Sequence, residues 1–454
     1  MHSGPTPARF DALRRGLAGT LYEPADDGYA ALATPWNVAV ATSPAAVAEV
    51  ATAQDVVAAV RFAADHDLPV AVQATGHGIA SDLDGALLIH TRRLDECTIS
   101  PEGWARTGAG VTWRTVLAAS ATHGLAGLCG SAPDVSVAGY TSGGGIGPLA
   151  RTYGAASDRV RSFDLVTGDG LLRHVTAETE PDLFWGVRGG KGSLGVITAV
   201  EFDLLDLAEV YAGALIFGTD DVAAVSEAWA QWCPGLPAEA TTSLAWMQLP
   251  PLPGVPEALA GKFTAAVRYV YAGNHDDGAR WLAPLRAAGA PLMDLVGPMP
   301  YAMIGMVHAD PEDPMPAAET SALLAGFPAA AVGTLLDAAG PGTGSPQTIV
   351  EIRQFGGALG AEPAIPSALC HRDAAFNLYM VAAGAPPDLP AKAGHAVGVN
   401  AAMEPWSFGG TVPNFAGRAP FASSYTSGTL DRLTALASRY DPQHLFRLGQ
   451  VPVR

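Results

Sequence analysis

Long apolar runs are missing from this sequence of 454 residues, although hydrophobic residues make up 49% of it. Asp, Arg, Gly or Pro interrupts every stretch before it reaches the about 18 residues that a membrane-spanning helix needs. The first residues also contain no apolar segment long enough for a signal peptide. These absences predict a soluble, cytoplasmic protein that does not enter a membrane.

Positive charge is scarce as well. The chain has 26 Lys and Arg against 44 Asp and Glu, which gives a net charge of −18. A protein that binds DNA or RNA needs a basic stripe against the phosphate backbone, and no such stripe is visible. We therefore expect no nucleic acid partner, and we attribute the acidic surface to solubility.

Cysteine is rare, and its four positions are scattered: Cys97, Cys129, Cys233 and Cys370. They form no CxxC pair and have no zinc-ligand spacing. This pattern indicates buried free thiols and predicts no metal site.

Two domains are expected from the length, because a single core seldom grows beyond about 250–300 residues. From about Ser43 to Leu205, short β-like runs alternate with helical runs, which is typical of an α/β or α+β unit. Within this part, the apolar spacing of Ala45–Asp67 predicts one amphipathic helix that leads into a strand at Val70–Ala74.

The rest of the chain has a different pattern. From about Ala208 to Pro390, longer strands are expected at 243–249, 263–271 and 348–355, separated by helical and Pro-rich connections. The tail begins irregularly and ends in a predicted helix at 430–440, which the Asp441-Pro442 pair stops.

Three glycine-rich segments stand out. Gln73-Ala-Thr-Gly-His-Gly78 follows a predicted strand, and its glycines let the backbone approach a ligand closely while the turn presents His77. Ser142-Gly-Gly-Gly-Ile-Gly147 exposes successive N–H groups that can bind a pyrophosphate, but it lacks the Lys-Ser/Thr ending of a P-loop. A polar loop histidine and a flexible turn are the plain alternatives for these two segments.

The third segment, Gly190-Lys-Gly-Ser-Leu-Gly195, matches the GxGxxG pattern of dinucleotide-binding folds. That pattern requires a helix after the last glycine, with its N-terminus at the pyrophosphate. The residues that follow, beginning Val196-Ile-Thr-Ala-Val, are β-branched and predict a strand. The context therefore excludes a Rossmann fold.

Together these segments resemble the FAD-linked oxidases of the berberine-bridge-enzyme type, whose FAD domain is of the vanillyl-alcohol-oxidase or PCMH type. The matching runs are PVAVQATGHG (69–78), DGALLIHTRRL (84–94), GSAPDVSVAGYTSGGGIGPLARTYG (130–154), DLFWGVRGGKGSLGVIT (182–198) and the tail NF…RYDPQHLFRLGQ (414–450). The resemblance implies an α+β fold with a two-part FAD-binding domain formed by both chain ends, 1–205 and 399–454. Between them it implies an inserted substrate domain, 206–398, with an antiparallel sheet flanked by helices.

The resemblance also implies a covalent cofactor. In this family the histidine of the first glycine-rich loop, here His77, is bonded to the 8α-methyl carbon of FAD. The pyrophosphate would be wrapped by the first and second loops, Gly195 and Val196 would contact the adenine end, and Asn414 would lie near the flavin ring. The residues expected at the cofactor are Ala74, Thr75, Gly76, His77, Gly78, Pro133, Asp134, Gly139, Ser142, Gly143, Gly144, Gly145, Gly147, Gly195, Val196, Asn414 and Phe415.

The sequence departs from the family at two places. Many relatives carry a second covalent link from the cysteine of a C-P-x-V-G run, but the matching run here is Ala132-Pro-Asp-Val-Ser136. Cys129 lies three residues earlier and is expected to be a packed thiol, so we predict a single attachment. Relatives also often show Y-x-N-Y in the tail, where this chain has Val412-Pro-Asn-Phe415 and no hydroxyl.

The missing tyrosine leaves the catalytic base open. Glu351 and Arg353 share one face of the predicted strand at 348–355, where burial would raise the pKa of the carboxyl toward the working range. A structural ion pair is the alternative. Tyr379 is the next candidate for the base, followed by Tyr140, Tyr301 and His308.

We therefore predict an FAD-dependent oxidase that acts on a hydroxyl, amine or activated C–H group of a small specialised metabolite, with oxygen reoxidising the flavin. A flavoprotein that uses FAD as a scaffold for a non-redox cyclisation or elimination is one alternative, and a nucleotide-binding module without catalysis is another. The sequence does not distinguish a monomer from a homodimer.

Overall fold

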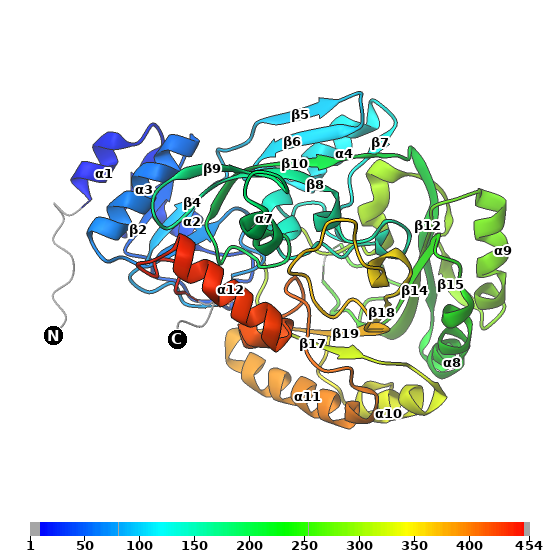
Figure 1. Ribbon diagram of the computed structural model, residues 1–454. Coiled ribbons are helices and arrows are strands. Elements are labelled where there is room, and N and C mark those ends of the chain that lie inside the picture. The colour runs from blue at the N-terminus through cyan, green and yellow to red at the C-terminus, as the bar shows by residue number, and fades with distance from the viewer. Residues whose placement is uncertain (1–9, 80, 253, 449–454) are drawn as a thin grey trace.

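The computed structural model describes residues 10–79, 81–252 and 254–448 and builds them around three main sheets (Figure 1). The N-terminal part forms two of them. The first has four strands in the order β1 (Thr20–Tyr22), β2 (Ala46–Glu49), β4 (Leu87–His90) and β3 (Val70–Gln73). The second has five strands in the order β5 (Cys97–Ser100), β6 (Trp104–Gly108), β10 (Val196–Asp203), β8 (Val160–Val166) and β9 (Leu172–Val175). A short pair, β7 (Leu125–Ala126) and β11 (Leu205–Asp206), lies apart from both.

The middle of the chain forms one large antiparallel sheet of eight strands. Its order is β15 (Pro291–Asp294), β12 (Glu209–Phe217), β14 (Phe263–Tyr271), β13 (Ala240–Gln248), β18 (Ile349–Gln354), β19 (Phe376–Ala383) and β17 (Ala317–Leu324), and β16 (Gly297–Pro300) also pairs with β12. Four helices cover one face of it: α8 (Val222–Trp232), α9 (His275–Arg286), α10 (Ala329–Ala339) and α11 (Leu389–Ala402). The predicted α+β fold with an antiparallel substrate-domain sheet is confirmed, while the domain boundaries at 205/206 and 398/399 stay a prediction.

The remaining helices belong to the two chain ends. They are α1 (Asp11–Gly16), α2 (Tyr29–Ala33), α3 (Ala53–Asp65), α4 (Trp113–Ala121), α5 (Val137–Ser142), α6 (Ala150–Tyr153), α7 (Pro181–Val187) and α12 (Ser427–Tyr440). Helix α12, drawn in red in Figure 1, packs on α7, so the end of the chain returns to the N-terminal part. Within the described ranges, no helix is long and apolar enough to cross a membrane.

The prediction of a single helix over Ala45–Asp67 is wrong at its start. Residues Ala46–Glu49 form a buried strand that pairs with β1 on one side and β4 on the other. The helix begins only after Thr52, whose hydroxyl accepts a hydrogen bond from the Asp55 N–H while the Asp55 carboxylate accepts one from the Thr52 N–H. This capping box fixes the boundary that apolar spacing alone could not locate.

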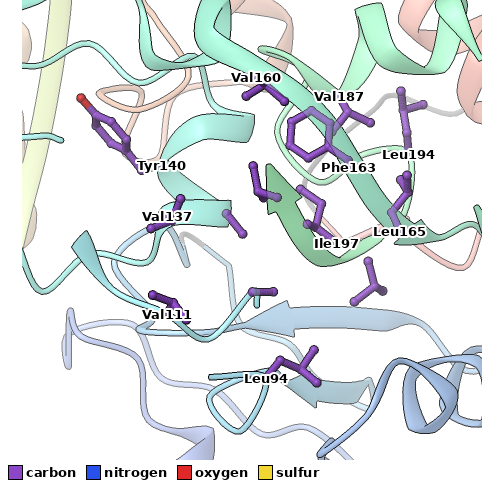
Figure 2. Close-up of a cluster of buried hydrophobic side chains, with 14 of the residues drawn as sticks. Leu94, Val111, Val137, Tyr140, Val160, Phe163, Leu165, Val187, Leu194 and Ile197 are labelled. Carbon is purple, nitrogen blue, oxygen red and sulfur yellow. The ribbon is translucent and has the colours of Figure 1, made fainter. Parts of the chain in front are cut away.

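The region after the GxGxxG segment is a strand, as predicted, since β10 starts directly after Gly195. Strand β10 lies in the centre of the five-stranded sheet and contributes to the larger hydrophobic core. Figure 2 shows part of this core, where Phe163, Leu165 and Ile197 lie among other apolar side chains. Tyr140 lies at the border of the group, with its hydroxyl turned away from it (Figure 2).

The second core lies between the eight-stranded sheet and its helices. Strand alternation points Trp246, Tyr269 and Tyr271 into this core, so these aromatic side chains pack against the helices and do not line a cleft. The opposite face of the sheet is turned toward the N-terminal part of the chain, where the cavity lies.

Candidate active site

A cavity of about 1560 Å³ lies between the N-terminal part and the inner face of the eight-stranded sheet. The loop after β3, the segment before and within α5, and the tail loop at Asn414 form one side of it. Side chains from β12, β13, β14, β17, β18 and β19 form the other side. The volume exceeds the roughly 300–1,000 Å³ of ordinary ligand pockets, so it is large enough for a dinucleotide and a second small molecule.

His77 is held in the wall of this cavity by three contacts. Its ring stacks on the Trp36 indole with centroids 4.9 Å apart, its Nδ1 atom lies 3.1 Å from the Thr75 hydroxyl, and its Nε2 atom lies 3.2 Å from the Asp134 carboxylate. Gly76 before it has φ +80, and a Cβ there would lie 2.8 Å from the Trp36 backbone nitrogen. The turn that presents His77 therefore requires glycine, as expected.

The predicted cofactor residues of the first loop all line the cavity, whereas only some of the other predicted residues do. The predicted residues that line it are Ala74, Thr75, Gly76, His77, Gly78, Gly139, Ser142, Gly195, Asn414 and Phe415. Those that do not line it are Pro133, Asp134, Gly143, Gly144, Gly145, Gly147 and Val196.

The glycine cluster after α5 packs closely against its neighbours. A Cβ at Gly147 would lie 2.0 Å from the Cys129 carbonyl oxygen, and a Cβ at Gly143 would lie 2.6 Å from the Asn414 amide nitrogen. Gly144 and Gly145 likewise press against Leu369 and Ala156. Close packing of the loop therefore requires glycine at these positions, and their contact with the pyrophosphate stays a prediction.

Asn414 ties the tail to this loop. Its side-chain oxygen accepts a hydrogen bond from the Gly145 N–H at 2.8 Å, and its side-chain N–H donates to the Tyr140 carbonyl oxygen at 3.2 Å. Beside it, the Phe415 ring lies under the Arg353 guanidinium at 4.9 Å and meets Tyr379 edge to face at 5.3 Å. The position where relatives carry a tyrosine therefore contacts a tyrosine from the inserted sheet.

Glu351 and Arg353 both face the cavity, on the predicted side of β18. The expected rise in the pKa of Glu351 is wrong. Burial alone would raise it, but Arg353 at 2.8 Å and Arg268 at 2.6 Å hold the pKa well below its usual range. With His308 beside it as well, Glu351 forms a buried ion-pair network, which is the alternative considered above.

Glu319 on β17 is a carboxyl that the sequence did not single out. It lines the cavity and is hydrogen-bonded to Tyr379, a neighbour on β19. Burial raises the pKa of Glu319, although Tyr379, His77 and Lys191 oppose this. Burial also raises the pKa of Tyr379 well above its usual value, so its phenol stays protonated.

The lower-ranked candidates are less well placed. The Tyr140 hydroxyl is buried without a hydrogen-bond partner in the described part of the chain, and burial raises its pKa well above the usual value. Tyr301 donates to the Gly127 carbonyl oxygen behind the cavity wall. Cys129 is buried, and burial raises the pKa of its thiol to about 12, as expected of a packed thiol.

These residues fit a flavin dinucleotide. Glycine-rich loops line one side of the cavity, and the buried Nε2 atom of His77 makes no well-aligned hydrogen bond. Gln73, next to the same loop, also has a buried side-chain oxygen without a hydrogen-bond partner among the described residues. Unsatisfied buried polar atoms at a cavity are typical of a ligand site.

The comparisons with known proteins agree. Residues 44–176 match the family model described as "FAD binding domain". The (R)-6-hydroxynicotine oxidase of Paenarthrobacter nicotinovorans is 34% identical over 195 residues, which cover 42% of this chain and 42% of that protein. The alignment thus spans less than half the length of this curated relative.

The similarity in structure extends over the whole chain. A 6-hydroxy-D-nicotine oxidase from Arthrobacter nicotinovorans matches with a TM-score of 0.82 and 26% identity, covering 95% of this chain and 96% of that one. A berberine-bridge-enzyme-like protein of Physcomitrella patens matches with a TM-score of 0.86 and 19% identity, covering 98% and 99%. Residues 44–176 therefore match an FAD-binding domain, and the whole chain shares the fold of these berberine-bridge-enzyme-like and 6-hydroxy-D-nicotine oxidase structures.

Proposed function

We propose that this enzyme carries FAD bonded to His77 and oxidises a hydroxyl, amine or activated C–H group of a small specialised metabolite, with oxygen as the final acceptor. The observation that carries the proposal is the placement of His77, whose ring is fixed in the wall of the cavity by Trp36, Thr75 and Asp134. When bound, FAD accepts the hydride equivalent that leaves the substrate. The chain's own residues bind and orient the substrate and take its proton.

A single attachment is part of the proposal. Ala132 lines the cavity at the position where relatives carry the second linking cysteine. Cys129, the nearest thiol in sequence, is buried and hydrogen-bonded to Tyr301 at 3.6 Å. A thiol with a raised pKa is a poor nucleophile, which favours one link only.

The walls of the cavity favour a substrate with an apolar body. The part formed by β12, β13 and β18 carries Ile216, Met247 and Ile349, and Leu249 and Met293 border the same region. A sugar ring would need hydrogen-bond partners there that aliphatic side chains do not supply. Charged side chains lie around Tyr379, where Glu319 and Arg353 contact it, and we place the reacting end of the substrate there.

The covalent link is tested by denaturing the purified protein in acid and measuring flavin fluorescence in the pellet. We expect the fluorescence to stay with the wild-type polypeptide and with His123→Ala, a control at an exposed histidine. His77→Ala should release all of its flavin, because no other nucleophile replaces the imidazole. Release of the flavin from the wild-type protein would overturn the proposal.

We further propose that Tyr379 and Glu319 take the substrate proton in place of Glu351. Burial keeps the Tyr379 phenol protonated, so its oxygen would accept the substrate proton while its own proton moves to the Glu319 carboxylate, whose pKa burial raises. Glu351 is less suited, since two arginines stabilise its charged form. The substrate can be found as the compound that bleaches the flavin absorbance without oxygen.

With that compound, Tyr379→Phe should slow anaerobic flavin reduction by on the order of 10²–10⁴-fold, the usual contribution of a positioned proton acceptor. The bound flavin content should not change. An unaltered reduction rate would remove Tyr379 from the mechanism. Hydrogen peroxide released on mixing with oxygen would exclude the non-redox alternative.

A further inference from the structure

Asp134 lies beside His77 and does not itself line the cavity. Its carboxylate oxygen is 3.2 Å from the His77 Nε2 atom. In the part of the chain that the structure describes, His77 is the one basic side chain within 4 Å of the Asp134 carboxylate. The run Ala132-Pro-Asp-Val-Ser136 thus replaces a family cysteine and at the same time supplies a carboxylate to the histidine.

The loop that carries Asp134 is fixed at several points. The Arg114 N–H donates to the Pro133 carbonyl oxygen at 2.7 Å, and the Trp113 N–H donates to the Val135 carbonyl oxygen at 3.1 Å. The Ser136 N–H donates to the Thr75 hydroxyl at 3.3 Å, which joins this loop to the one that carries His77. These contacts therefore fix the loop from which the Asp134 side chain reaches the imidazole.

We propose that Asp134 is a positioning residue that promotes the attachment of FAD to His77, an inference that rests on the covalent link proposed above. Attachment joins a ring nitrogen of His77 to the 8α carbon and breaks one C–H bond of that methyl group and the N–H bond of the ring. The two electrons and two protons pass to the flavin, which becomes reduced, and dioxygen then reoxidises it and forms hydrogen peroxide.

During this step the imidazole becomes cationic until its N–H proton leaves. A carboxylate beside Nε2 stabilises that cation, accepts the proton and fixes the ring orientation. The contact with His77 and the charge of Arg114 outweigh the effect of burial and lower the pKa of Asp134, so the carboxylate is charged at neutral pH. Arg114 is itself paired with Glu312 at 2.8 Å, which leaves Asp134 available to the imidazole.

The test compares full-length variants incubated aerobically with added FAD, and it measures flavin in the acid-denatured pellet against total bound flavin over time. In Asp134→Asn we expect the rate of covalent incorporation to fall by about ten- to a hundredfold, the loss seen when a carboxylate that orients a metal-bound histidine is removed. Bound but releasable FAD should accumulate instead. Asp203→Asn removes a carboxylate that is paired with Arg161 and contacts neither His77 nor Arg114, and it should behave as the wild type.

Two further measurements separate positioning from a structural role. Asp134→Glu should recover most of the covalent incorporation, and sodium formate, but not sodium chloride, should accelerate it in Asp134→Ala. Equal incorporation in Asp134→Asn and the wild type would overturn the inference. So would a loss of all flavin that neither Glu nor formate restores. If the wild type itself holds no covalent flavin, the proposed link to His77 is wrong, and that outcome is seen before any variant is compared.

Discussion

Two carboxyls on the same sheet face, buried Glu351 and half-buried Glu319, differ in pKa because their neighbours differ. Glu351 lies between Arg268 and Arg353, and its pKa is lowered, whereas Glu319 lies near Tyr379 with Lys191 as the nearby cation, and its pKa is raised. The sequence pointed to Glu351 because its strand carries an obvious charged pair. The same arginine that made the pair visible makes the carboxylate a poor proton acceptor.

The different pKa shifts of Glu351 and Glu319 predict that replacing each carboxyl by an amide has a different effect on stability. Glu351→Gln should lower the free energy of unfolding by about 3–5 kcal/mol, because it leaves two buried guanidinium groups without their anion. Glu319→Gln should leave stability unchanged or raise it at pH 7, because the charged carboxylate is disfavoured there by burial. Urea unfolding at pH 7 measures both.

The dependence on pH follows from the same shifts. The stabilisation from Glu351 is complete above the unfolded-state pKa of about 4.3 and is lost as the pH falls through the lowered folded-state pKa. Glu319 has a raised pKa, so its contribution is present below about 4.3 and is lost as the pH rises through the folded-state value. Glu312→Gln, at an exposed ion pair, is the control and should cost less than about 1 kcal/mol. Equal losses in the Glu319 and Glu351 variants would contradict this account.

At the scale of elements, local sequence patterns predicted most strands and helices, because hydrophobic periodicity and turn-forming residues act over only a few positions. The strand at Phe263–Tyr271 has the expected bounds, and β10 follows Gly195 as its β-branched residues indicated. The failure over Ala45–Asp67 arose because alanine-rich segments fit either a buried strand or a helix. There the cap at Thr52 was the more informative signal.

Sites that depend on pairing between distant strands were not predictable in this way. In the pairing of β17 with β19, Ser321 lies opposite Tyr379. Glu319 lies two residues before Ser321, on the same face of the sheet, so it reaches Tyr379 diagonally although the two residues are about 60 positions apart in the sequence. Likewise, Asp134 and His77 come together only through the contacts between two loops. Only the glycine-rich loops, which combine a cofactor signature with local geometry, located the site from the sequence.

At the scale of the whole molecule, the site exists only while the inserted sheet faces the two chain ends. Arg151 on α6 is buried at this junction. Its guanidinium donates to the Ala240 carbonyl oxygen at 2.8 Å, to the Phe355 carbonyl oxygen at 2.6 Å and to the Leu236 carbonyl oxygen at 3.2 Å. One side chain from the N-terminal part therefore holds the start of β13 and the end of β18 together.

Replacing Arg151 by Met should lower the free energy of unfolding by at least about 2 kcal/mol, since each buried carbonyl left without a donor costs roughly 1–3 kcal/mol. Arg161→Met removes a half-exposed ion pair with Asp203 and should cost less than about 1 kcal/mol. Because the lost contacts join the two parts, the Arg151 variant should also separate the thermal unfolding curve into two transitions, which calorimetry detects. A single transition with the stability of the control would mean that burial of the sheet face, rather than Arg151, keeps the two walls of the cavity together.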